Sequence, residues 1–477
     1  LHGLHRARLW RCRIYWNAHL KLSNKTLFAF AFLNLPLSLG GLPLGLYLTP
    51  YYASEFGISL SMIGVIIMLT RITDVITDPL IGTLSDRTPA KYGRRGLWIL
   101  IGMPIMSVAV IAVFDPFFTP TPLYLFTAVA LLYFGWTLIG IPLTAWIAEI
   151  SSDYNERSRI TGARTWGGIV GSLVAIAAPL ILAGLAGAGF SSLTPETPGS
   201  LQPMLRVLAW SSVIFLFISV PYLLLNVPQP RFKQTERVDL KKGFRLILQN
   251  QAFRRLLIAN VLGAIGWNSI NTLFIFFVTL YLLADASQWP IIIVSYLMGQ
   301  FVGTPLIMTI ASRFNKHRLL AVSSLISSAI FSLVLLFQPG DYVWYIVLNF
   351  FTGILAPANA ILAPSMAADV IDQDTLESGE QRGALFMALW GMADKFAIAA
   401  AAGITLPLVQ YLGFDPLIQN DPDSLKVLQY SFCFVPICFF ILSVGFLWNY
   451  PLTRERHGEL REALTRKNLL AQDMDGP

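Results

Sequence analysis

The sequence predicts an all-α integral membrane protein of about twelve transmembrane helices, and three observations support this fold class. The first is composition: 55% of the 477 residues are hydrophobic and 13% are charged, whereas charged residues make up about a quarter of a typical soluble domain. The second is a series of apolar runs, from Leu27 to Tyr450, that are each long enough to cross a bilayer as a helix. The third is the clustering of basic residues in alternate loops.

The net charge of +7 is explained by topology rather than by nucleic-acid binding. Basic residues gather at Arg87 to Arg95, at Arg157 and Arg159, from Arg231 to Arg255 and from Arg313 to Arg318, while the intervening loops carry almost none. This alternation is the positive-inside pattern, and it places both termini and the long middle loop in the cytoplasm. We therefore expect a multi-pass protein of the plasma membrane, in a bacterial inner membrane, with no nucleic-acid partner.

The chain divides into five segments in order. Residues 1–24 lack the apolar core of a signal peptide and are expected to form a cytoplasmic tail. Residues 25–227 hold six apolar runs, and residues 253–450 hold six more. Residues 228–252 form a polar linker whose later part, "LKKGFRLILQN", is predicted to lie as an amphipathic helix on the inner leaflet. Residues 451–477 form a second cytoplasmic tail.

An internal repeat supports the division into two halves. "PLIGTLSDR" at 79–87 matches "PLIMTIASR" at 305–313 at five positions, and each stretch ends the second apolar run of its half. Parallel repeats of six spans build the major facilitator fold, so we expect two pseudo-symmetric six-helix halves. Where the first half has Asp74 and Asp78, the second has Gln300 and Thr304. The two carboxylates therefore belong to a single site, not to a structural device used twice.

Asp74 and Asp78 are the least expected residues of the apolar runs. Their spacing of four places them on one face of a helix, together with Arg71. A charged group at the bilayer centre costs about 2.5–3.5 kcal/mol, and two ionised carboxylates repel, so a proton or a metal cation such as Na⁺ between them is favourable. The alternative is a fixed ion pair in which Arg71 or another buried cation neutralises them.

Two cationic residues are candidate partners of the acidic pair. Lys395 lies inside an apolar run of the second half, and we expect it to face the carboxylates across a cavity and to be released when a cation replaces it. Arg164 lies at the start of an apolar run, where it serves either solute binding or the positive-inside pattern. Apart from the coupling ion, Na⁺ or H⁺, no cofactor is expected.

Three segments from both halves stand out: "RITDVITDPLIGTLSDRTPAKYGRRGLWILIG", "IPLTAWIAEISSDYNERSRITGAR" and "ADVIDQDTLESGEQRGALFMALWGMADKFA". These segments resemble the glycoside–pentoside–hexuronide:cation symporters of the major facilitator superfamily and, more remotely, vertebrate lysolipid importers. The resemblance implies cation-coupled symport of a sugar- or glycoside-like small solute by alternating access. Position by position, it implies that Asp74, Asp78 and Thr137 bind the cation and that Arg164 and Lys395 line the solute cavity.

The sequence departs from melibiose-type members of that family at positions that hold sugar hydroxyls. Gly140 stands where those members have an aspartate, and the stretch around Ser38 carries no charge. A carboxylate can accept hydrogen bonds from two hydroxyls at once, which neither residue reproduces. We therefore expect a solute other than a galactoside: another glycoside, an anionic sugar, or a more apolar solute such as a lysolipid.

Two further groups of residues complete the expected site. Polar and aromatic residues of the apolar runs are candidates to line a central cavity, with Asn268 and Trp390 chosen as solute-binding residues. The acidic stretch at 368–382 faces basic loops of the first half, so we expect salt bridges between the halves that hold one conformation. The residues assigned to this gate are Asp86, Arg87, Arg94, Glu149 and Asp369.

Other classes of function find little support in the sequence. All five histidines lie in tails or loops, and the motifs H-E-x-x-H and G-x-S-x-G of hydrolases do not occur. No Gly-Lys dipeptide occurs either, so there is no ATP-binding loop of the G-x-x-x-x-G-K type. A membrane enzyme and a non-transporting sensor remain the alternatives from other classes. We expect a monomer whose partners are the solute, the monovalent cation and the bilayer.

Overall fold

The computed structural model describes residues 22–89, 93–150, 154–187, 201–228, 249–285, 288–378, 383–416 and 422–453, with Glu455 and Glu459. Within these residues the secondary structure is helical, and twelve helices are long and apolar enough to cross a membrane. The predicted fold class is confirmed. The two terminal tails and the amphipathic helix expected in the linker fall almost entirely outside the described residues.

In its described residues the first half contains six long helices and one short helix between the first two. Serine side chains cap two of them: Ser23 accepts a hydrogen bond from the Thr26 amide at 3.2 Å, and Ser59 accepts one from the Met62 amide at 3.4 Å. The helices are α1 (Asn24–Leu46), α2 (Leu48–Phe56), α3 (Leu60–Arg87), α4 (Arg94–Phe114), α5 (Pro122–Ile150), α6 (Tyr154–Gly187) and α7 (Gln202–Asn226).

The second half contains six long helices. The first is capped by Asn250, whose side chain accepts a hydrogen bond from the Phe253 amide at 3.0 Å. The helices are α9 (Gln251–Phe276), extended by a π-helical turn to Tyr281, α10 (Trp289–Ala311), α11 (Lys316–Ser332), extended by a 3₁₀ turn to Leu336, α12 (Tyr342–Ser378), α13 (Gly383–Tyr411) and α14 (Pro422–Leu447).

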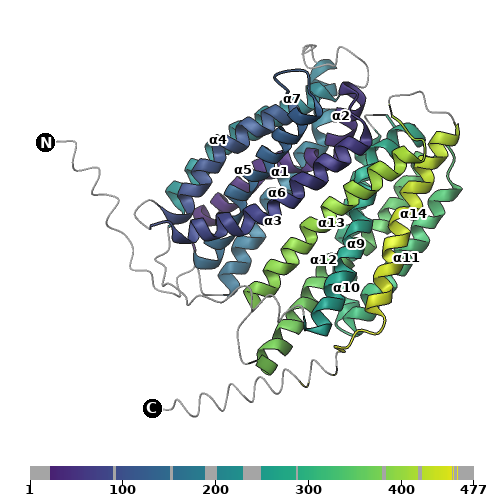
Figure 1. Cartoon of the computed structure of the whole chain (residues 1–477). Helices are drawn as coiled ribbons and strands as arrows, with labels where there is room; N and C mark the ends of the chain where they lie inside the picture. The colour runs from purple at the N-terminus through teal and green to yellow at the C-terminus, as the bar shows by residue number, and fades with distance from the viewer. Residues whose placement is uncertain are drawn as a thin grey trace, which may run out of the picture.

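Figure 1 shows the two halves as two groups of helices, α1–α7 in purple to blue and α9–α14 in teal, green and yellow. Because each half contains an even number of spans, α1 begins and α14 ends at the same end of the molecule, which we call the terminal end. The opposite end is the distal end. At the terminal end Thr26 Oγ1 donates a hydrogen bond to the Asn226 carbonyl at 3.3 Å. This bond links the beginning of α1 to the last residue of α7.

The halves meet mainly through α3 and α13, and the contacts nearest the distal end are close. The Ser61 amide donates a hydrogen bond to Gln410 Oε1 at 2.7 Å. Two glycines make the approach possible: a Cβ on Gly64 would lie 2.8 Å from the Ala402 carbonyl oxygen, and one on Gly403 would lie 2.7 Å from Met68 Sδ. Toward the terminal end, Leu80 and Leu84 of α3 are exposed. The structure is therefore closed between these helices at the distal end.

Gly403→Leu is expected to oppose this distal closure. Overpacking a close contact costs about 1–3 kcal/mol, which shifts an equilibrium between closed and open forms by roughly 5- to 150-fold. A cysteine introduced at Ser61 should accordingly react faster with a water-soluble maleimide in the Gly403→Leu variant. Gly445→Leu is the matched control, because a Cβ on this exposed α14 glycine meets nothing within 4 Å. Equal labelling rates in both variants would contradict the expectation.

Candidate functional site

The acidic pair lies on α3 at the level where the two halves come together. Asp74 and Asp78 are one turn apart, and the side chain of Asp74 is 4% exposed against 19% for Asp78. Pro79 follows them inside the same helix, which a membrane helix tolerates when neighbouring helices satisfy the freed backbone groups. The predicted common face is present, and both carboxylates point to neighbouring helices.

Lys395 of α13 brings the second half to these carboxylates. Its ammonium group forms an ion pair with Asp78 Oδ2 and lies 3.6 Å from Asp74 Oδ2. Lys395 and Asp78 are 317 residues apart in the chain. The structure thus brings together the lysine and the aspartates that the sequence singled out, with the ammonium group next to both carboxylates.

Arg71 completes the charge balance of the cluster. Its NH1 atom lies 3.4 Å from Asp74 Oδ2, and its guanidinium carbon lies 3.8 Å from the centre of the Tyr133 ring on α5. A cation over an aromatic face is attracted by the ring quadrupole. Two cations and two anions leave the cluster neutral, which is how membrane proteins accommodate ionised groups in their spans.

Thr137, also on α5, supplies a hydroxyl group to the cluster. Its Oγ1 donates a hydrogen bond to Asp78 Oδ1 at 3.0 Å, and the residue is buried. The two carboxylates and this hydroxyl group offer the hard oxygen ligands that Na⁺ and Li⁺ prefer. The same carboxylates can instead carry a proton, so the donor set suits either coupling ion.

A cavity of about 430 Å³ lies between the halves on the distal side of the acidic pair. Arg71, one turn before Asp74, belongs to its wall. Its lining includes Gly45, Arg71, Tyr133, Asn268, Asn271 and Asn349. The volume falls in the range of about 300–1,000 Å³ that is usual for small-molecule sites. Asn268, predicted from the sequence as a solute-binding residue, lines this cavity.

Of the other three predicted solute-binding residues, Lys395 lies at the acidic pair, and Arg164 and Trp390 lie elsewhere. Arg164 donates from Nε to Asn34 Oδ1 at 3.2 Å and from NH1 to Thr144 Oγ1 at 3.4 Å, so α6 is joined to α1 and α5. Trp390 is buried in the core of the second half, whose members include Phe253 and Phe386. The structure therefore places Arg164 and Trp390 outside the wall of the distal cavity.

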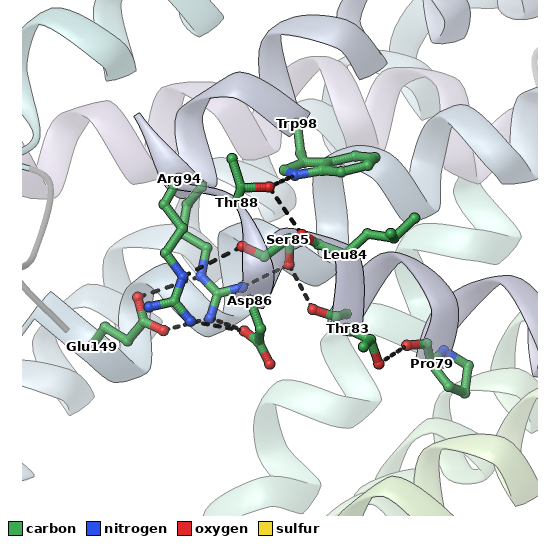
Figure 2. Close-up of polar contacts among 11 residues, drawn as sticks. Pro79, Thr83, Leu84, Ser85, Asp86, Thr88, Arg94, Trp98 and Glu149 are labelled. Atoms are coloured by element: carbon green, nitrogen blue, oxygen red, sulfur yellow. Dashed lines mark hydrogen bonds and ion pairs between the residues drawn. The ribbon is translucent and has the colours of Figure 1, made fainter. Parts of the chain in front are cut away.

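Four of the five residues assigned to a gate, Asp86, Arg94, Glu149 and Asp369, form ion pairs at the terminal end. Figure 2 shows Asp86, Arg94 and Glu149 within one network of ion pairs and hydrogen bonds in the first half. Asp86 Oδ1 lies 3.2 Å from Arg94 NH2 and 2.5 Å from Arg95 NH2, and Arg95 also pairs with Glu149. Arg95 was not among the predicted residues, although it is adjacent to Arg94 and better paired than the exposed Arg87.

Asp369 has the corresponding arrangement in the second half. Lys316 Nζ lies 2.6 Å and 2.9 Å from its two carboxylate oxygens. The ion pairs of Asp86 with Arg94 and Arg95, of Glu149 with Arg95 and of Asp369 with Lys316 each join residues of one half, whereas the sequence predicted salt bridges between the halves. A gate between the halves stays a prediction.

Tyr133 is a residue of the site that sequence reasoning missed. It is almost fully buried and carries the Arg71 guanidinium on its ring. One tyrosine among many aromatic residues in an apolar run carries no signal of that role. Only a prediction that α3 packs against α5, as it does in the structure, would have found it.

Comparison with known proteins relates this chain to membrane transporters. A family model described as MFS/sugar transport protein matches residues 29–454. The chain is 24% identical to a putative glycoside/cation symporter of Escherichia coli, over 85% of this chain and 87% of the relative. It is also 24% identical to the sodium-dependent lysophosphatidylcholine symporter 1 of Homo sapiens, over 93% of this chain and 88% of that relative. The crystal structure of the nucleoside transporter NupG superposes with a TM-score of 0.63 at 15% identity, over 90% of this chain and 98% of that one.

Proposed function

This chain belongs to the MFS/sugar transport protein family and is a multi-pass membrane transporter, not an enzyme, and from this premise we propose that it couples the entry of Na⁺ or H⁺ to the uptake of a compact, sugar- or glycoside-like solute. The cation binds at Asp74, Asp78 and Thr137. The solute binds between the halves, which alternate between a distal-closed and a distal-open form around it.

The observation that carries this proposal is the position of Lys395 between the two carboxylates. The ammonium group and a cation compete for the same oxygens, so binding of one releases the other. Because Lys395 belongs to the second half and the aspartates to the first, the exchange also removes an ion pair between the halves. Cation binding thereby changes the relative stability of the two forms, which is the requirement for coupling.

The orientation of the protein follows from its charges. The terminal end carries the basic loops, so the positive-inside pattern places it in the cytoplasm. The distal-closed form is then the form that faces inward. We place the protein in the plasma membrane of a bacterium, as a monomer.

The solute class rests on the distal cavity and on the relatives. A volume of about 430 Å³ suits a compact solute, in line with the relative that is named a glycoside/cation symporter. A lysolipid is the alternative class, because the human relative is named a lysophosphatidylcholine symporter. The volume favours the compact solute.

The test is accumulation by purified protein reconstituted in vesicles. Radiolabelled sugars and glycosides are supplied outside, and a gradient of Na⁺ or of H⁺ is imposed in separate experiments. A tenfold ion gradient supplies about 1.4 kcal/mol, so one ion per solute supports about tenfold accumulation. We expect accumulation under one of the two gradients. Equilibration without accumulation under both would show an uncoupled facilitator and contradict the proposal.

A further inference from the structure

We propose that Arg71 binds an anionic group of the solute in the distal cavity, and that cation binding at the acidic pair frees it to do so. The solute is then a compact organic anion that also carries hydroxyl groups. This inference rests on the proposed function, because it names the solute class of the same transporter. It goes beyond that function in assigning the recognition of charge to Arg71, rather than to Arg164 or Lys395.

Arg71 has unused hydrogen-bonding capacity beside the cavity. A guanidinium group carries five N–H donors. One of them contacts Asp74 at 3.4 Å, which is long for a charge-assisted hydrogen bond. Its Nε is buried and has no hydrogen-bond partner among the described residues. A buried donor without a partner is unfavourable. The Arg71 side chain is 20% exposed and belongs to the cavity wall, so a ligand in the cavity can accept hydrogen bonds from the guanidinium group once its release from Asp74 turns these donors toward the cavity.

The opposite wall of the cavity suits hydroxyl groups. Asn268 and Asn271 of α9 and Asn349 of α12 line it. The amide nitrogen of Asn349 donates to the Ile292 carbonyl at 2.8 Å, and that of Asn268 donates to the Ala264 carbonyl at 2.8 Å. These bonds orient the two side chains by their nitrogen atoms and leave the amide oxygens as the acceptors for a ligand. Hydroxyl groups donate to such acceptors.

Charge balance links the anion to the cation. Arg71 and Lys395 both lie near Asp74 Oδ2, at 3.4 Å and 3.6 Å. With Asp78 included, the four charges sum to zero. A cation bound at the carboxylates raises the sum to +1 and takes over the neutralisation of Asp74, so Arg71 is released toward the cavity. An anionic solute returns the sum to zero, whereas a neutral solute does not.

It follows that the cation and the anionic solute strengthen each other's binding. Thermodynamic linkage requires this effect to be equal in both directions. A neutral analogue of the same shape gains no such effect. The transported pair carries no net charge, so accumulation follows the ion concentration gradient and not the membrane potential.

Three probes with the same ring separate the alternatives: methyl β-D-glucoside, methyl β-D-glucuronide and glucose 6-phosphate. The first is neutral, the second is a carboxylate and the third is a phosphate. Affinities are measured by titration calorimetry on the purified full chain, with and without Na⁺, at pH 5.5 and pH 7.5. We expect binding of the carboxylate or the phosphate to strengthen at least tenfold with the coupling ion, while binding of the glucoside is weak and independent of the ion.

Two variants localise the effect. Arg71→Gln removes the charge and should weaken binding of the anion by roughly 10- to 100-fold, the usual range for a hydrogen bond to a charged group, with no loss for the glucoside. Gly45→Leu fills the cavity, because Gly45 lines it and a Cβ there meets nothing within 4 Å. It should abolish solute binding and keep the ion-dependent rise in melting temperature. Gly445→Leu is again the control.

The outcomes are distinguishable. Equal affinity for the glucoside and the glucuronide, full anion binding by Gly45→Leu, or no binding of any of the three probes would overturn this inference. An ion effect on neutral and charged probes alike would leave the coupling function standing and remove the role of Arg71. Absence of any ion effect on the wild-type protein, on binding or on melting temperature, would instead contradict the proposed coupling.

Discussion

Asp78→Asn is expected to abolish ion-driven accumulation of solute while the helix bundle remains folded. The carboxamide has the shape of the carboxylate, but it removes a negative charge that Lys395 and Thr137 contact. Two unit charges 4 Å apart interact by about 4 kcal/mol at an effective dielectric constant of about 20. The affinity for the coupling cation should therefore fall by two to three orders of magnitude.

The measurement compares accumulation in vesicles under the effective ion gradient. The parent should concentrate the solute, and the variant should reach at most the outside concentration. Asp423→Asn is the control, because Asp423 is a highly exposed carboxylate whose pair with Lys426 lies at the surface, and it should accumulate solute like the parent. Accumulation by Asp78→Asn at the level of the parent would show that this carboxylate is a structural ion pair and not part of a coupling site.

Lys395→Gln is expected to raise the affinity for the cation and to slow net uptake. The ammonium group is the competitor of the cation, and its removal leaves two carboxylates without their inter-half partner. Breaking a buried pair in this way costs about 3–5 kcal/mol. Since a bound cation relieves that cost, apparent cation affinity should increase at least tenfold. The empty carrier must reorient with unpaired carboxylates, so net uptake should fall at least tenfold.

Two assays on the same vesicles separate these effects. Exchange of labelled for unlabelled solute at saturating cation does not require the empty carrier to reorient, so it should persist in Lys395→Gln when net uptake is lost. Cation affinity is read from the ion-dependent melting temperature. Lys426→Gln is the control, because Lys426 lies at the exposed end of α14 and pairs with Asp423. An unchanged cation affinity in Lys395→Gln would mean that the lysine and the cation do not share a site.

The spacing of Asp74 and Asp78 was sufficient to predict a common face, because the helical period is a local property of the chain. The same reasoning selected Lys395, since an ionised group in an apolar run needs a partner. Reasoning from the sequence could not find Tyr133 or Arg95. Tyr133 is one of several aromatic residues in its apolar run, and Arg95 is one of several basic residues in its loop. The same reasoning also grouped Arg164 and Trp390 with the site, whereas one bonds to Asn34 and the other packs in the core of the second half.

The number of spans, their division into halves and the residues that must be neutralised were determined by the sequence alone, because hydropathy acts within one span of about 20 residues and the helical period acts over one or two turns. The tertiary structure decided which ions meet, which residues line the cavity and at which end the halves are closed. Those outcomes depend on the rotation of each helix about its axis and on the close approach of α3 to α13. Packing between segments more than three hundred residues apart, such as Asp78 and Lys395, sets both.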